Sequence, residues 1–175
     1  MMPNLNGKVI LVDENDQLLG TENKLQAHLG KGQLHRAFSI FILDNSDRVL
    51  LQRRADSKYH CPGLWSNSCC SHPQPGADLV AEARKRLQFE LGINAELNEF
   101  SVVQYRLELG DDMTEWELNH LFYGRYEGGV SPNPEEVADY KWVPLLQIEP
   151  DLRRQKANYT PWLPIVLAPL LANLS

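Results

Sequence analysis

Short apolar segments separated by polar turns dominate this sequence, and they constrain the fold more than any other feature. Seven segments have strand character, and they span 8–12, 17–20, 36–43, 48–52, 101–109, 114–125 and 137–143. Acidic and amide residues at 13–16 and 44–47 separate the first four into two predicted hairpins. Strands mixed with a few helices predict an α/β (α+β) fold, in which a mixed sheet is covered by helices.

Only one segment shows a clear helical period. A helix predicted over 78–91 starts with Asp78 as N-cap and stops at Gly92. Its apolar side chains share one face: Val80, Ala83, Leu87 and Leu91. Shorter helices are expected over 22–28 and after the Thr-Pro pair at 160–161.

The length of 175 residues predicts a single domain over 1–175, and the charge bounds its partners. A net charge of −6 argues against a nucleic-acid binder. The longest apolar run, 162–172, is too short to cross a membrane and contains two prolines. The start of the chain shows no secretory signal, and three cysteines within 61–70 do not suggest a disulfide framework. A reduced, cytoplasmic protein is expected, as a monomer with a dimer as the alternative.

The stretch 54–76 has no hydrophobic period, and it accumulates Pro, Gly, Cys and His. A compact domain seldom keeps so long a loop without a functional reason. Within it, Cys70 lies two residues before His72 and could serve as a catalytic thiol, an acid or a metal ligand. A structural zinc site of Cys61, Cys69, Cys70 and His72 is a weaker alternative, because adjacent cysteines ligate one tetrahedral ion poorly. Buried, inert cysteines are the simplest interpretation.

A second group of residues offers metal ligands. Glu115 and Glu117 are two residues apart, so on a strand both carboxylates leave the same face, while Trp116 and Leu118 point into the core. The imidazoles that could join them are His28, His35 and His72. Together they suit Zn²⁺ or Mn²⁺. On spacing alone, a solvated strand face with scattered surface histidines remains the favoured interpretation.

A third group is cationic and stands out on an acidic protein. Its members are Lys24, Arg53, Arg54, Lys58, Arg84, Lys85 and Arg86. Gathered around one pocket, they would indicate a phosphorylated substrate. Arg86 also lies four residues from both Glu82 and Glu90, so ordinary pairs on a helix surface are the alternative.

Taken in order, these residues resemble the type I isopentenyl diphosphate isomerase family from about Lys24 to Trp162. The most specific part is 65–73, Trp-Ser-Asn-Ser-Cys-Cys-Ser-His-Pro, which is similar to the family signature Asn-Ser-x-Cys-x-His-Pro. The resemblance implies a Nudix-like fold. The segment 90–93, Glu-Leu-Gly-Ile, resembles the end of a Nudix box, but Lys-Arg at 85–86 stands where Arg-Glu is usual.

The resemblance also implies an activity and a set of roles. The family interconverts isopentenyl diphosphate and dimethylallyl diphosphate by protonating a carbon–carbon double bond and removing a proton from the neighbouring carbon, through a tertiary carbocation. By resemblance, Cys70 and Glu117 are the two proton carriers. Tyr105 should hydrogen-bond to Glu117, and Trp162 should place its ring against the cation.

Ligands and substrate contacts follow from the same resemblance. His28, His35, His72, Glu115 and Glu117 would hold Mn²⁺ or Zn²⁺. Glu90 would share Mg²⁺ with the diphosphate and the main-chain carbonyl of Cys70. Lys24, Arg54, Lys58 and Arg86 would neutralise the diphosphate. A Nudix-type diphosphate hydrolase and a non-catalytic zinc-binding module are the alternative functions.

The chain departs from the family pattern at three positions of the loop. Cys61 stands where an aromatic residue is common, and Ser71 replaces a common glycine. Cys69 lies beside the expected catalytic residue, so the choice of Cys70 rests on the x-His-Pro spacing.

Overall fold

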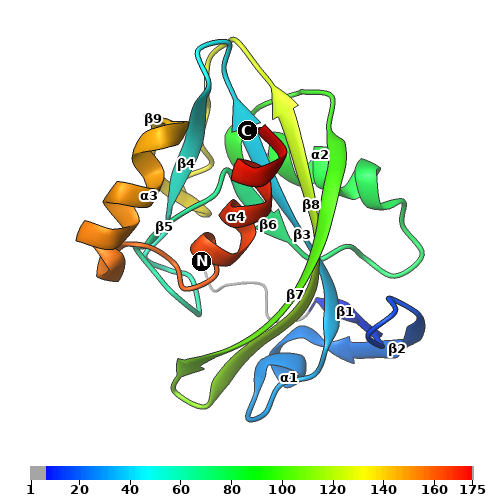
Figure 1. Cartoon of the computed structure of the whole chain (residues 1–175). Helices are drawn as coiled ribbons and strands as arrows, with labels where there is room; N and C mark the ends of the chain where they lie inside the picture. Colours follow the sequence, from blue (N-terminus) through cyan, green and yellow to red (C-terminus); the bar gives the residue numbers. More distant parts are fainter. Residues whose placement is uncertain (1–6, 175) are drawn as a thin grey trace.

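A mixed β-sheet with helices packed on both faces forms the fold (Figure 1). The computed structural model describes residues 7–174; residues 1–6, which the expectation about a secretory signal concerns, lie outside this range. The elements are β1 Lys8–Val12, β2 Leu18–Asn23, α1 Lys24–His28, β3 His35–Leu43, β4 Arg48–Arg54, β5 Trp65–Ser66, β6 Cys69–Ser71, α2 Leu79–Leu91, β7 Asn98–Gly110, β8 Met113–Arg125, β9 Val137–Pro144, α3 Leu145–Arg154, a 3₁₀ turn Lys156–Asn158 and α4 Leu163–Leu174. The predicted fold class is confirmed.

Strand β3 is the centre of the sheet. It pairs in parallel with β8 along its whole length, and antiparallel with β1, β4 and β6 at its other contacts. Strand β7 forms a long antiparallel hairpin with β8, and β9 pairs with β4. A strand enclosed in this way is buried on both faces, which explains the nearly unbroken apolar run of β3.

The alternating side chains of β3 separate two hydrophobic cores. Phe38, Ile40 and Ile42 pack with α2, whereas Phe41 and Leu43 pack with α3 and α4. In Figure 1, α2 accordingly lies behind the sheet and α4 in front of it. Residues at odd positions of β3 therefore face the side that carries α4, and this is the side on which the site is built.

Helix α2 has the predicted ends and a slightly different buried face. The Asp78 carboxylate accepts a hydrogen bond from the Ala81 amide at 3.0 Å, and Gly92 ends the helix in the left-handed region with φ 67°. The prediction for Val80 is wrong, because its side chain is exposed. Leu79 packs on the core in its place, since 79, 83 and 87 form a regular spacing of four.

The second predicted hairpin is largely wrong. Strands β3 and β4 are joined by the expected turn, but only Leu43 and Val49 pair. Beyond that point β3 pairs with β8 and β4 pairs with β9. Local sequence revealed the turn, whereas the residues that pair with both strands lie 82 to 96 positions further along the chain.

Three smaller expectations also change. The helix expected over 22–28 is limited to Lys24–His28, because Asn23 caps it and Glu22 belongs to β2. The loop 54–76 contains two short strands, β5 and β6. Helix α3, Leu145–Arg154, was not expected from the sequence. Within 7–174 no helix combines the length and the apolarity that crossing a membrane requires.

Candidate active site

One row of side chains crosses three neighbouring strands and forms the base of the site. Glu117 on β8 lies directly opposite Tyr105 on β7 and His35 on β3. The Tyr105 hydroxyl donates to Glu117 Oε1 at 2.7 Å, and Asn119 Nδ2 donates to the Tyr105 oxygen at 3.0 Å. All four side chains are buried. Sheet register, rather than loop geometry, therefore fixes this carboxylate.

The Nε2 atoms of His28 and His35 face the Glu115 and Glu117 carboxylates without a hydrogen-bond partner. The Nδ1 atom of His28 donates to the Lys24 carbonyl at 2.7 Å, and Nδ1 of His35 donates to the Gln33 carbonyl at 2.8 Å. Since a carbonyl only accepts, these bonds assign a proton to Nδ1, so the neutral form of each ring carries its lone pair on Nε2. Each Nε2 lies 3.3 Å from a carboxylate oxygen, of Glu115 and Glu117 respectively, yet makes no hydrogen bond.

This arrangement fits a metal ion. A lone pair that faces a carboxylate oxygen in a buried place is unfavourable without a cation between them. The ligand atoms of His28, His35, His72, Glu115 and Glu117 all lie within 4.8 Å of one another. The five residues predicted from the sequence are thus brought together, and the interpretation as a solvated strand face is wrong for Glu115 and Glu117, which are both buried.

The expectation that Trp116 and Leu118 both point into the core is only half right. Leu118 is buried in a small cluster with Ile10 and Val12. Trp116 is half-buried outside the core, where the Arg106 guanidinium lies 5.7 Å from its ring centroid.

The imidazole of His72 completes the cluster from the loop. Its Nε2 lies 2.8 Å from Glu117 Oε2. Burial lowers the pKa of His72 to about 3, so the ring is neutral at pH 7, as a metal ligand must be. Burial and the charge of Glu115 alone would raise the pKa of Glu117, but contacts with His35 and His72 outweigh them and hold it below its usual value. Glu117 is therefore an ionised carboxylate.

The two adjacent cysteines face opposite sides of the sheet. Cys69 is fully buried in the core beneath α2, whereas Cys70 is half-buried, packs against the α4 core and lines the pocket. Strand β6 produces this difference, because Cys70 pairs with Ser39 and Cys69 with Ile40. Burial raises the pKa of the Cys70 thiol to about 12, so the group is protonated at neutral pH.

Trp162 forms another wall of the same pocket. Its indole nitrogen donates to the Ser66 hydroxyl at 3.0 Å, and Thr160 contacts the same hydroxyl at 3.1 Å. These bonds tie the start of α4 to β5. The Arg54 guanidinium lies 5.3 Å from the ring centroid of Trp162.

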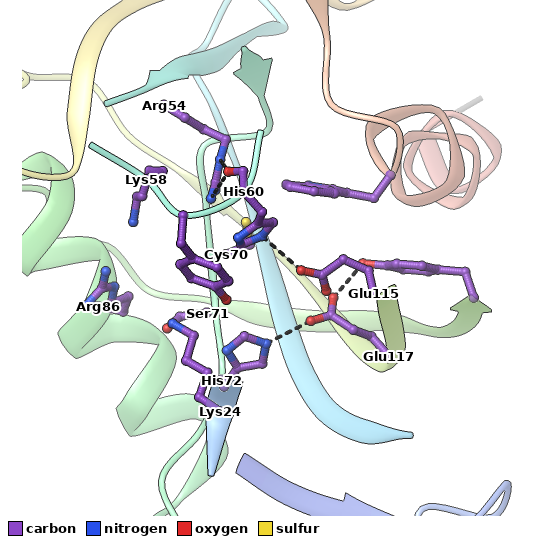
Figure 2. A pocket seen from close by; sticks show the side chains of 13 residues that line it. Lys24, Arg54, Lys58, His60, Cys70, Ser71, His72, Arg86, Glu115 and Glu117 are labelled. Carbon is purple, nitrogen blue, oxygen red and sulfur yellow. Dashed lines mark hydrogen bonds and ion pairs between the residues drawn. The ribbon is translucent and has the colours of Figure 1, made fainter. Parts of the chain in front are cut away.

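Four predicted cations reach the pocket from three parts of the chain. Lys24, Arg54, Lys58 and Arg86 all line it, together with Cys70, His72, Tyr105, Glu115, Glu117 and Trp162. Figure 2 shows Lys58 and Arg86 on one side, Glu115 and Glu117 on the other, and Cys70 between them. Burial, together with the charges of Lys58 and Arg86, lowers the pKa of Lys24 to about 8. The pocket thus has a cationic end and an end with the metal-binding cluster.

The predicted Mg²⁺ ligand, Glu90, lies behind the cationic end. It is buried and does not line the pocket. Its carboxylate accepts from Gln52 Nε2 at 3.0 Å and pairs with Arg86, which does line the pocket. Both oxygens therefore have protein partners in this structure.

Other predicted groups are not brought together. Cys61, Cys69, Cys70 and His72 form no metal-binding cluster in the described part of the chain, and Cys69 faces away from the other members. The cations Arg53, Arg84 and Lys85 do not line the main pocket. Arg84 instead contacts Asn94, and Arg53 lies 3.9 Å from Asp56.

Three residues that line the pocket or pair with its cations were not predicted from the sequence. His60 Nε2 lies 2.9 Å from Glu115 Oε1, and burial lowers its pKa to about 4. Tyr59 lines the pocket beside it. Glu136 pairs with Lys58 and, at 3.0 Å, with Arg86. His60 lay within the aperiodic stretch 54–76, which was the only signal available; nothing in the sequence marked Glu136.

Comparisons with known proteins identify a matching family model and named relatives. A family model described as the NUDIX domain matches residues 33–163. A protein of Aromatoleum aromaticum named isopentenyl-diphosphate Delta-isomerase 1 is 50% identical over 156 residues, which cover 89% of this chain and 88% of that relative. An isopentenyl-diphosphate Delta-isomerase of Serratia proteamaculans is 41% identical over 165 residues, covering 94% and 92%.

Solved structures support the fold alone. A Deinococcus radiodurans protein superposes with a TM-score of 0.75 at 17% identity, covering 92% of this chain and 97% of that one. A MutT NUDIX hydrolase from Burkholderia pseudomallei gives a TM-score of 0.58 at 17% identity, covering 78% and 97%.

Proposed function

Since the chain belongs to the NUDIX family and, within it, to the isopentenyl-diphosphate Delta-isomerases, we propose that it interconverts isopentenyl diphosphate and dimethylallyl diphosphate. One observation carries the proposal furthest. A single pocket is lined by four cations, by the half-buried Cys70 thiol and by the buried Glu117 carboxylate. This arrangement suits a substrate with a charged diphosphate head and a small hydrocarbon tail.

The reaction moves one proton onto the double bond and takes another from the neighbouring carbon. An unactivated alkene is a poor base, so the site must supply an acid, a base and a dry environment. Cys70 and Glu117 are the two proton carriers in this proposal. The Cys70 thiol holds its proton at neutral pH because burial raises its pKa to about 12. Glu117 is ionised and can take up a proton, and the hydrogen bond that the Tyr105 hydroxyl donates to Oε1 holds its carboxylate in place.

Trp162 has the role of stabilising positive charge. A carbocation has no lone pair to accept hydrogen bonds, so an aromatic face or a carboxylate is the group that stabilises it best. The ring is almost fully buried and is held at its nitrogen by Ser66. Fixing the ring in advance avoids the cost of ordering it during the reaction.

The cluster of five ligands would hold Mn²⁺ or Zn²⁺ in this proposal. His28, His35, His72, Glu115 and Glu117 would be its ligands, and the unpartnered Nε2 atoms of the first two support this. When bound, such an ion neutralises the two carboxylates and polarises Glu117. Glu90 and the main-chain carbonyl of Cys70 would share a Mg²⁺ ion with the diphosphate; in this structure the Glu90 carboxylate contacts Gln52 and Arg86.

The diphosphate serves as a handle that positions the hydrocarbon. Lys24, Arg54, Lys58 and Arg86 would neutralise it, and their position on the pocket wall supports this. We further propose that the chain acts as one domain over 1–175, as a monomer, in the cytoplasm. Three free cysteines without a disulfide support a reducing compartment.

Proton NMR in deuterated water tests the function. The protein is incubated with isopentenyl diphosphate, Mg²⁺ and Mn²⁺ or Zn²⁺. Dimethylallyl diphosphate carrying deuterium in its new methyl group is the expected product. Release of inorganic phosphate or pyrophosphate without isomerisation would instead favour a Nudix-type hydrolase. A folded, metal-loaded sample that neither exchanges protons nor forms product would refute the proposal.

A further inference from the structure

The hydroxyl of Tyr59 is buried and has no hydrogen-bond partner among the described residues. A buried hydroxyl without a partner loses its bonds to water and gains nothing in return. Native structures keep few such groups, and each one calls for an explanation, such as a functional role or a bound partner. The proposed roles above do not use Tyr59.

Tyr59 lies at the junction of two adjoining cavities. The first cavity is the pocket with Cys70, Glu117 and Trp162. The second cavity contains none of these three, and it adds Lys8 and Glu136. The residues that line both cavities are Lys24, Lys58, Tyr59, Ser71, His72 and Arg86. The tyrosine therefore lies beside three of the four cations assigned to the diphosphate, and it also contacts His28 of the metal-binding cluster.

Neighbouring side chains fix the ring of Tyr59. The Lys24 ammonium lies 5.1 Å from its centroid, the His60 ring 4.2 Å and the His28 ring 5.9 Å. A ring held on several sides keeps its hydroxyl in one place. A donor fixed before the ligand arrives loses little entropy on binding.

We propose that Tyr59 binds the substrate by donating a hydrogen bond from its hydroxyl to a diphosphate oxygen. This inference rests on the proposed function and adds a contact to it. Tyr59 is a neutral donor among cations, so it adds a directed bond without adding to their mutual repulsion. Because the diphosphate does not react, the bond is equally strong in the ground state and the transition state, and it acts on KM rather than on kcat.

Tyr59→Phe tests the proposal, because it removes the hydroxyl and keeps the ring. A hydrogen bond to a charged group predicts that KM for isopentenyl diphosphate rises roughly 10-fold or more, while kcat stays within about 2-fold. Tyr140→Phe is the matched control, since Tyr140 is exposed on β9 and should leave both constants unchanged. An unchanged KM in Tyr59→Phe, or a loss confined to kcat, would overturn the proposal.

Calorimetric titration with inorganic pyrophosphate and Mg²⁺ separates this proposal from the proposed function. The native protein should bind pyrophosphate, and Tyr59→Phe should bind it roughly 10-fold more weakly with an unchanged melting temperature. Equal affinities would refute the role of Tyr59 even if the native protein is an isomerase. Weaker binding by the variant would support that role even if the native protein formed no dimethylallyl diphosphate.

Discussion

Residues 7–174 contain two clusters of histidine and carboxylate side chains, and only one of these two is suited to a metal. The first is the pocket cluster of His28, His35, His72, Glu115 and Glu117. The second, which we call the hairpin clasp, joins His120 to Glu99 and Asp16, with Arg36 also bound to Asp16. It ties the turn between β1 and β2 to strands β7 and β8.

The difference lies in the partners of the imidazole nitrogens. In the hairpin clasp both nitrogens are engaged, because Nδ1 of His120 contacts Glu99 and Nε2 lies 2.9 Å from Asp16. In the pocket cluster, main-chain carbonyls take the Nδ1 protons of His28 and His35 and leave Nε2 unpartnered. The number of histidines and acids therefore does not identify a metal centre. What indicates a metal centre here is an imidazole nitrogen that lies beside a carboxylate and has no hydrogen-bond partner.

Equivalent substitutions in the two clusters should have very different effects. Glu117→Gln removes a proposed proton carrier and a metal ligand, so kcat should fall by about 10⁴-fold. Glu99→Gln makes the same change in the hairpin clasp and should leave kcat within about 2-fold. Steady-state kinetics on both variants measures this, with circular dichroism to establish that each is folded. Similar losses in the two variants would remove the distinction between the clusters.

The cysteine pair extends the comparison to the two faces of the sheet. Cys70→Ala should lower kcat by about 10³-fold, because it removes a positioned acid from the pocket. Cys69 lies under α2, so Cys69→Ala should leave turnover unchanged and lower the free energy of unfolding by on the order of 1 kcal/mol. Kinetics and urea denaturation separate the two effects. If Cys69→Ala lost the activity and Cys70→Ala kept it, the assignment of the proton carrier would be wrong.

Metal removal should affect only the pocket cluster. Dialysis against a chelator should lower turnover at least about 100-fold and leave the far-ultraviolet circular dichroism unchanged, because strands β3, β7 and β8 position the ligands without the ion. The melting temperature should fall, since a ligand present at 100 times its dissociation constant stabilises by about 2.7 kcal/mol. Global unfolding on chelation would instead indicate a structural zinc module.

The smallest effect is expected in the hairpin clasp itself. His120→Gln can satisfy only one of its two carboxylates, so the free energy of unfolding should fall by about 1 kcal/mol, a value limited by the partial exposure of Glu99 and Asp16. Turnover and metal content should not change. Loss of bound metal from this variant would show that the two clusters are coupled.

Sequence predicted local features well and distant pairings poorly. The Asp78 cap and the Gly92 stop of α2 depend on neighbouring residues, and both are confirmed. The hairpin between β3 and β4 is mostly absent, because their long pairings form with β8 and β9. Nothing in a local pattern shows which distant strand a buried segment will choose.

The same limit applies to the site. Spacing could place Glu115 and Glu117 on one face, but it could not say whether that face was buried, and the solvated alternative was favoured on spacing alone. Family resemblance named the five ligands, which the structure brings together. It did not name His60, Tyr59 or Glu136, because their contacts depend on how the loop 54–64 and the segment before β9 fold over the pocket. The catalytic roles of Cys70, Glu117, Tyr105 and Trp162 stay predictions.

The parallel pairing of β3 with β8 has a consequence for how folding of this protein can be followed. His35 and Glu117 stand opposite each other in one row, and a slip of β8 by a single residue would turn both glutamates to the far side of the sheet. Metal uptake therefore requires the native register of two strands separated by about 80 residues of chain. If Co²⁺ is added during refolding, the appearance of its bound-state absorption or paramagnetic signal would report when β3 and β8 reach their native register.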